Sequence, residues 1–233
     1  MSVYIKWLKF TRDYKKFAFL HSKHPRFSMS WASRYPILNE STRETSFDAH
    51  YIYHPAWAAR ILAKTRPEFH VDISSTLNFC TLVSAFIPVR FYDFRPAKIN
   101  LENLQSDRAD LTHLHFPEGS IESLSCMHVV EHIGLGRYGD TIDPDGGLKA
   151  MEELKRVVKK NGTLLFVVPV GLPVIRFNAH RIYSYDQIVT SFSGFKLKQF
   201  ALVDDLGSFI ADADKSMADK QKYGCGCWWF IRK

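Results

Sequence analysis

The chain has 233 residues, of which 46% are hydrophobic and 24% are charged, and its formal net charge is +7. This length and composition indicate one sizeable α/β domain with an extension, and they argue against two full domains and against a largely disordered chain. There is no run of about 18 apolar residues and no cleavable signal pattern, so the sequence predicts a soluble, cytoplasmic protein.

The first 26 residues form a basic and aromatic segment. Its only acid is Asp13, and cationic and aromatic residues interleave along it. Either the aromatic side chains dock on the domain, or the segment binds an anionic surface such as the inner membrane face or a glycan. No recognised nucleic-acid-binding module is present, so no nucleic acid is expected as a partner. We predict a basic, irregular extension over residues 1–50 and a single domain over 51–233.

A regular pattern begins near Pro55. A helical stretch, AWAARILAK, is followed by the apolar run FHVDI, and a second helical stretch, NFCTLVSAF, is followed by the run VRFYDF. This alternation of helix and strand is typical of the beginning of a doubly wound sheet.

The alternation continues with a short segment around ADLTHLHF, taken as the third strand, and the run SLSCMHVV. An amphipathic helix, GLKAMEELKRVVKK, precedes the apolar strand TLLFVVPV, and Gly162 is expected in the left-handed position between them. After a helix over residues 184–191, the strands KLKQFALVDD and CWWFIRK are predicted to pair antiparallel and to close one edge.

In an open α/β sheet, ligands bind beyond the carboxyl ends of the strands, where the strand order reverses. Asp93 ends its strand about 20 residues after Asp72, a separation at which a carboxylate accepts hydrogen bonds from both hydroxyls of a ribose. The alternative is that Asp93 caps the following turn. The other residues expected at this edge are Asp72 to Asn78, Asp110, Leu111, Glu131, His132 and residues 169–181.

Two runs, ADLTHLHFPEGSIESLSCMHVVEHI and MEELKRVVKKNGTLLFVVPV, resemble the core of the class I S-adenosylmethionine-dependent methyltransferases. This resemblance implies a Rossmann-like fold with a mostly parallel seven-stranded sheet, an antiparallel final strand and helices on both faces. It also implies S-adenosylmethionine as the cofactor, held by Asp72, Ser74, Thr76, Asp93, Asp110 and Leu111.

Three further stretches, FDAHYIYHPAWAARIL, EHIGLGRYGDTIDPDGG and RFNAHRIYS, resemble a family of domains of unknown function associated with bacterial surface-polysaccharide genes. That resemblance implies O-methylation of a saccharide or a related small molecule in cell-surface glycan synthesis. Two alternatives keep the fold: a domain without the cofactor that acts on a sugar nucleotide or glycan, and a non-catalytic module that binds a glycan or a partner.

The first loop departs from the methyltransferase pattern Asp-x-Gly-x-Gly-x-Gly, because Ser74, Thr76 and Asn78 stand at the glycine positions. Small polar residues cap helices, and asparagine tolerates positive φ, so the turn is still able to form. A β-carbon at each position would nevertheless narrow a cofactor pocket. The two interpretations are a working loop and a repurposed one.

The loop over residues 131–147 is long for a strand-to-helix connection, and long loops at this edge are usually functional. The predicted acceptor-binding residues are Glu131, Arg137, Tyr138, Asn178 and Arg181. An alternative for Arg181 is that it only orders the neighbouring loop. Three aspartates, Asp140, Asp143 and Asp145, suggest a turn with a helix cap, a substrate contact or a divalent-cation site.

Methyl transfer to oxygen needs a base, and His132 and His180 are the catalytic candidates, since histidine titrates in the required range. Each could equally be structural. His50, Tyr51, Tyr53 and His54 precede the first predicted helix, where they would fold over the pocket as a lid or where the tyrosines would pack onto the sheet. Because Cys225 and Cys227 are too close and too few for a four-ligand zinc site, no metal is predicted.

Overall fold

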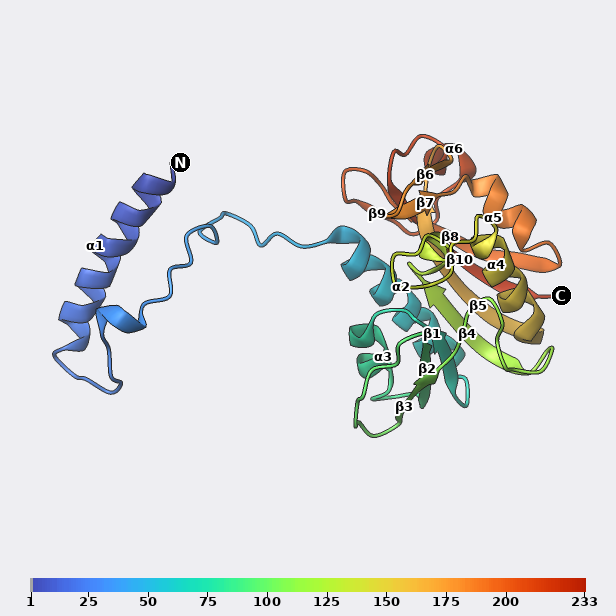
Figure 1. Ribbon diagram of the computed structural model, residues 1–233, viewed down its shortest axis with the longest axis horizontal. Helices are drawn as coiled ribbons and strands as arrows, with labels where there is room; N and C mark the ends of the chain where they lie inside the picture. The colour runs from blue at the N-terminus through green and yellow to red at the C-terminus, as the bar shows by residue number, and fades with distance from the viewer. Residues whose placement is uncertain (1) are drawn as a thin grey trace. The chain divides into compact units, whose positions relative to one another are not determined.

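A computed structural model describes residues 2–233 and divides the chain into two compact units, one reaching to Phe47 and one running from Asp48 to Lys233 (Figure 1). The N-terminal unit contains α1 (Val3–His21) and a 3-10 turn, η1 (Trp31–Ser33). The ring centroid of Trp31 lies 4.8 Å from that of Tyr14, so the turn packs against the helix. No helix in the described part of the chain is long and apolar enough to cross a membrane.

The expectation of an irregular N-terminal segment is wrong over α1, which is helical for 19 residues. The aromatic residues Trp7, Phe10, Tyr14 and Phe17 recur at spacings of three and four and so share one side of the helix, although none of the helix's residues is buried. Further apolar residues, Ile5, Leu8 and Phe19, lie on the opposite side among the lysines, and they obscure this period in the sequence.

The second unit is built on an eight-stranded sheet with the order β3-β2-β1-β4-β5-β10-β8-β9. The strands from β3 to β5 are parallel, whereas β10 runs antiparallel to both of its neighbours, and β9 adds a two-residue edge. The strands are β1 (His70–Ile73), β2 (Val89–Asp93), β3 (Leu104–Arg108), β4 (Ile121–Met127), β5 (Val158–Val170), β8 (Phe195–Val203), β9 (Phe209–Ile210) and β10 (Gly224–Arg232). This arrangement confirms the predicted mostly parallel sheet with an antiparallel final strand.

Helices cover both faces of this sheet (Figure 1). One face carries α2 (Ala49–Thr65) and α3 (Leu77–Val83), and the other carries α4 (Gly146–Val157) and α5 (Tyr185–Ser191). The remaining short elements are η2 (Val130–His132), the hairpin β6 (Val174–Arg176) with β7 (His180–Ile182), and α6 (Lys215–Ala218).

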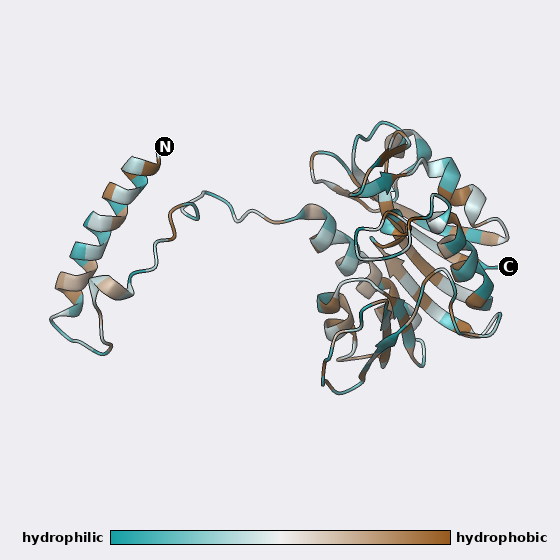
Figure 2. Ribbon diagram, in the orientation of Figure 1, coloured by the Kyte–Doolittle hydropathy of each residue, from teal (hydrophilic) through white to brown (hydrophobic). Residues whose placement is uncertain are grey.

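Successive side chains of the central strands point to opposite faces of the sheet, so the sheet has an apolar core on each face. In β5, Leu164 and Phe166 pack toward α4 and α5, whereas Leu165 and Val167 pack toward α2 and α3. Because both faces of the strand are buried from Leu164 onward, residues 164–170 are a continuous apolar run with no polar alternation. Figure 2 shows apolar residues gathered along these strands, between the helical layers.

Two predicted boundaries differ from the structure. The third strand is Leu104–Arg108 and not the stretch around ADLTHLHF, because an edge strand that buries only its first residue gives little apolar signal. The predicted antiparallel pairing of the last two long strands is confirmed, with β10 lying between β5 and β8 and β9 added outside β8. The chain enters β5 at Val158, and Asn161, not Gly162, has the left-handed φ of 62°.

An ion pair on α4 holds the loop that follows β3. Arg156 forms a bidentate pair with Glu153 and also donates to the carbonyl oxygens of Leu114 and Phe116, each at 2.8 Å. Glu153 in turn accepts from the backbone N–H of Leu114 at 2.7 Å. The planar guanidinium thus joins the helix to the loop that begins near Asp110.

Replacing the guanidinium of Arg156 by an ammonium should disrupt these contacts between α4 and the loop. We expect Arg156→Lys to lower the free energy of unfolding by about 1–2 kcal/mol, because a lysine cannot satisfy the carboxylate and both carbonyls together. Urea denaturation of Lys155→Ala is the matched control, since Lys155 pairs with the exposed Glu152 at the same spacing and should change stability by less than about 0.5 kcal/mol. Equal effects of the two substitutions would contradict the assignment.

Candidate functional site

A cavity of about 390 Å³ opens at the carboxyl ends of β1, β2 and β4. This is where the strand order reverses, since β2 and β3 lie to one side of β1 while β4 and β5 lie to the other. Ligands of doubly wound sheets bind at this position. Of the predicted site residues, those that line the cavity are Ser74, Asp93, Asp110, Leu111, His132 and Tyr138.

The glycine-free loop after β1 forms a tight turn. Ser74 has a left-handed φ of 57°, its backbone N–H donates to the carbonyl of Tyr92 at 2.8 Å, and its hydroxyl lies 3.3 Å from the same oxygen. Thr76 caps α3 by accepting from the N–H of Phe79 at 3.3 Å, and it does not line the cavity. Serine therefore holds the backbone conformation that glycine would adopt most easily.

Asp72 does not line the cavity but is completely buried beneath the loop. Its carboxylate accepts from the backbone N–H of Ser75 at 2.9 Å and from the hydroxyl of Ser125 on β4. The ring of His70 bridges Ser125 and Ser123, with both distances at 2.8 Å. Asp72 thus has a structural role, because it joins the loop to β4. The prediction that it contacts the cofactor directly is wrong, since its side chain does not reach the cavity.

Burial raises the pKa of Asp72 to about 6, against the hydrogen bonds from Ser125 and Ser75, which lower it. Leaving water penalises the charged form of a carboxylate more than the neutral form. Ionised Asp72 is therefore costly to the fold at neutral pH.

Two acidic side chains border the cavity at the ends of neighbouring strands. One carboxylate oxygen of Asp93 accepts from the N–H of Arg95 at 2.7 Å, and one of Asp110 accepts from the N–H of Thr112 at 2.8 Å. In each case the other oxygen has no protein partner among residues 2–233. Asp93 therefore caps a turn, as one interpretation expected, and still presents an acceptor to the cavity.

A buried carboxylate organises the histidines after β4. Glu131 is 1% exposed, and one of its oxygens accepts from Nδ1 of His128 at 2.7 Å while lying 3.8 Å from Nε2 of His132. His132 donates from Nδ1 to the carbonyl of Ala179 at 2.6 Å. Because a carbonyl only accepts, the neutral ring carries its lone pair on Nε2.

The loop after η2 is held by its own polar groups. Asp140 accepts from the backbone N–H groups of Gly134 at 2.7 Å and Tyr138 at 3.2 Å, and Asp143 pairs with Lys149 at 2.6 Å. The side chain of Asp145 forms no cap at the start of α4. These contacts correspond to the turn interpretation of the aspartates.

Several predicted acceptor-binding groups point elsewhere. Arg181 is buried and donates to the carbonyls of Ile133 at 2.6 Å and Pro144 at 3.2 Å, so it orders the loop through backbone groups and not through an acid. Arg137 donates to the carbonyl of Ala179 at 3.0 Å. Asn178 is exposed and outside the cavity lining.

His180, the second predicted base, also lies outside the cavity lining, with its ring centroid 4.8 Å from that of Tyr223. Burial lowers its pKa. His128, which the sequence did not single out, does line the cavity. The available signal was its position three residues before Glu131, at the end of a predicted strand.

Comparisons with known proteins bear on the fold. A family model described as "Caenorhabditis protein of unknown function, DUF268" matches residues 111–215. No curated protein gives a significant match.

Solved structures similar to this chain include a putative methyltransferase from Bacillus halodurans, with 14% identity, a TM-score of 0.54 and coverage of 76% of this chain and 97% of that one. The N-methyltransferase NodS from Bradyrhizobium japonicum, in complex with S-adenosyl-L-homocysteine, shares 10% identity with a TM-score of 0.54, over 79% and 87% of the two chains. A putative methyltransferase in complex with the Trm112 activator of Haloferax volcanii shares 16% identity with a TM-score of 0.53, over 79% and 90%. The second unit therefore has a Rossmann-like methyltransferase fold.

The buried carboxylate beneath the loop leads to a prediction about pH. A folded-state pKa of about 6, above the usual 3.8, gives stability that is fully present below about pH 3.8 and is lost as the pH rises through 6. Asp72→Asn removes the titration, so the stability of the wild type relative to this variant should fall by roughly 2–3 kcal/mol between pH 4 and pH 8. Urea denaturation across this range measures the difference.

Asp107→Asn serves as the control, because this carboxylate on β3 is exposed. Its stability difference from the wild type should stay flat. A flat difference for Asp72→Asn as well would show that the buried carboxyl does not titrate differently in the folded and unfolded states.

Proposed function

We propose that this protein is an S-adenosylmethionine-dependent methyltransferase that transfers the methyl group to a hydroxyl oxygen of a saccharide or related small molecule. The observation that carries the proposal is the cavity at the switch point of the sheet, bordered by the carboxylates of Asp93 and Asp110 beside the intact turn at Ser74. The fold of the second unit supports it, since enzymes with this architecture include methyltransferases crystallised with the demethylated cofactor.

The residues around the cavity fit an adenosyl group. Asp93 offers a carboxylate oxygen at the end of β2, suited to ribose hydroxyls, while Asp110 and Leu111 follow β3, suited to the adenine edge. Ala109 and Val129 add apolar surface for the base. A cavity of about 390 Å³ is within the range that small-molecule sites occupy.

The serine at the first glycine position is compatible with this fit. The backbone of Ser74 already has the left-handed conformation, and its hydroxyl lies toward Tyr92 on β2. The side chain of Ser74 thus lies against β2, on the neighbouring strand. This contact supports the interpretation of the loop as a working one.

When bound, the cofactor supplies an electrophilic methyl group on a sulfonium. The protein's part is to hold the acceptor and to take its proton as the oxygen attacks. His132 fits this task, because its Nδ1–H is fixed on Ala179 and its Nε2 carries the lone pair. Glu131, 3.8 Å from Nε2, would stabilise the imidazolium that forms.

The rim of the cavity suits an acceptor rich in hydroxyl groups. The guanidinium of Arg95 lies 4.9 Å from the ring centre of Tyr138, and both residues line the cavity. Flat aromatic and guanidinium surfaces next to carboxylates bind sugar rings through stacking and hydrogen bonds. The saccharide assignment depends on this chemistry and on the resemblance described above.

Cofactor binding is tested by calorimetry with S-adenosylhomocysteine. Asp93→Ala should weaken binding at least tenfold, because it removes the acceptor for two ribose hydroxyls. Asp107→Ala is the matched control, since it removes an exposed carboxylate from the adjacent strand outside the cavity lining and should leave the affinity unchanged. Absence of heat with the wild-type protein at millimolar ligand would refute the proposal.

The role of His132 is tested by turnover in a screen of saccharide acceptors. His132→Ala should lower kcat by about 10²–10⁴-fold while S-adenosylhomocysteine still binds, because only the proton acceptor is lost. The exposed His24 lies in the N-terminal unit, and His24→Ala should keep the wild-type rate. A His132→Ala variant with unchanged kcat would exclude this residue as the base.

A further inference from the structure

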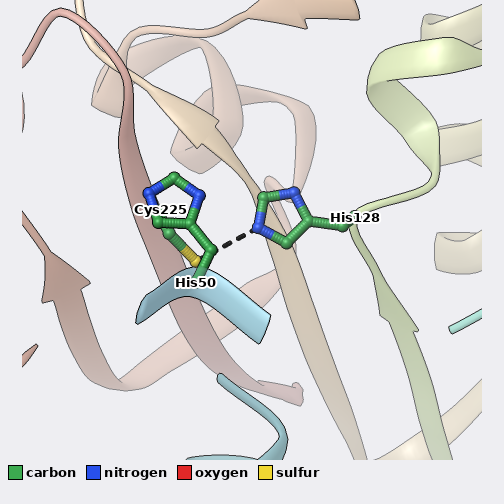
Figure 3. A group of neighbouring side chains, drawn as sticks. All are labelled: His50, His128 and Cys225. Carbon is green, nitrogen blue, oxygen red and sulfur yellow. Dashed lines mark hydrogen bonds between the residues drawn. The ribbon is translucent and has the colours of Figure 1, made fainter. Parts of the chain in front are cut away.

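Three potential metal ligands converge from three separate elements. His50 lies in the first turn of α2, His128 directly follows β4, and Cys225 is the second residue of β10. One ligand atom from each lies within 4.8 Å of the other two (Figure 3). His128 and Cys225 are buried and His50 is half-buried.

We propose that His50, His128 and Cys225 form a zinc(II) site. Imidazole nitrogen and thiolate sulfur are the ligands that zinc prefers, whereas magnesium and calcium require oxygen. Metal–ligand distances of about 2.0–2.3 Å in a tetrahedral site place the ligand atoms about 3.3–3.6 Å apart. Nε2 of His128 already lies 3.3 Å from Sγ of Cys225, so the remaining adjustment falls on the half-buried His50.

Glu131 prepares His128 for this role. The carboxylate accepts from Nδ1 of His128 at 2.7 Å, which places the proton on Nδ1 and the lone pair on Nε2, facing Cys225. Metal-binding histidines usually donate their other N–H to a carboxylate or carbonyl, which orients the ring and increases its basicity. Glu131 is therefore positioned to orient His128 as a zinc ligand.

Unpartnered atoms beside the three ligands also favour a bound ion. The second carboxylate oxygen of Glu131 and Nε2 of His54 are buried and have no hydrogen-bond partner among the described residues. The ring centroid of His54 lies 5.1 Å from that of His128. Buried polar groups are normally satisfied, and a water coordinated to the ion would provide a partner for Nε2 of His54.

Three protein ligands leave the fourth tetrahedral position for water, the arrangement found in open zinc sites. His128 also lines the cavity, so the ion would lie at its border. There it would fasten the beginning of α2 to β4 and β10. This inference does not depend on the proposed methyl transfer, since the ligands are complete without a cofactor.

The test is zinc binding by the full-length, reduced protein after treatment with a chelator. We expect one zinc per chain by elemental analysis, and a thiolate-to-metal charge-transfer band when cobalt(II) replaces zinc. Cys225→Ser should abolish that band, and His50→Asn should weaken zinc binding at least hundredfold in competition with a chromogenic chelator. Cys80→Ala removes another buried thiol and should leave both readouts unchanged.

Circular dichroism of each variant shows whether it is folded, and His50→Asn keeps the test valid if Cys225→Ser does not fold, because His50 is half-buried. Less than one-tenth of an equivalent of zinc on the folded wild type would overturn the proposal. So would equal zinc affinity of the wild type and His50→Asn, which would assign the metal to other histidines. If the folded wild type binds no zinc, the contact between His128 and Cys225 is a hydrogen bond from thiol to imidazole.

Discussion

The buried carboxylate of Glu131 is the interaction around which the candidate site is arranged. A carboxylate that is 1% exposed is tolerated in a protein interior only with hydrogen-bond donors around it. His128 supplies one donor, and His132 lies on the other side of the same oxygen. The acid thereby orients His128, while His132 is oriented by its bond to Ala179, and both rings border the cavity at the end of β4, where the strand order reverses.

The walls of the cavity are held by backbone conformations that most residues avoid. Ser74 after β1 and His128 after β4 have φ values of 57° and 58°. Such conformations cost free energy in non-glycine residues and persist only where the surroundings impose them. For Ser74, these surroundings are the hydrogen bond to Tyr92 and the anchoring of the next residue on Asp72. A polar network thus replaces the conformational freedom of glycine in this loop.

Much of the site's location was predictable, but the direction of individual side chains was not. Asp93 and Asp110 follow parallel strands, and the ends of such strands meet at one edge, so both reach the cavity as expected. Asp72 and Arg181 were expected at the same edge. The carboxylate of Asp72 instead lies under the loop, and the guanidinium of Arg181 binds backbone carbonyls. Strand position determines the edge, whereas packing determines which polar side chains remain available for a ligand.

The sequence by itself determined the class of fold, because alternating helical and apolar periods specify a doubly wound sheet regardless of distant contacts. It also determined the edge where ligands bind. Only the tertiary structure brought His50, His128 and Cys225 together, through α2 packed on one face and β10 inserted between β5 and β8. No local period encodes that insertion, since it depends on pairing strands that are far apart in the chain, and two cysteines near the C-terminus carried no sign of two distant histidines.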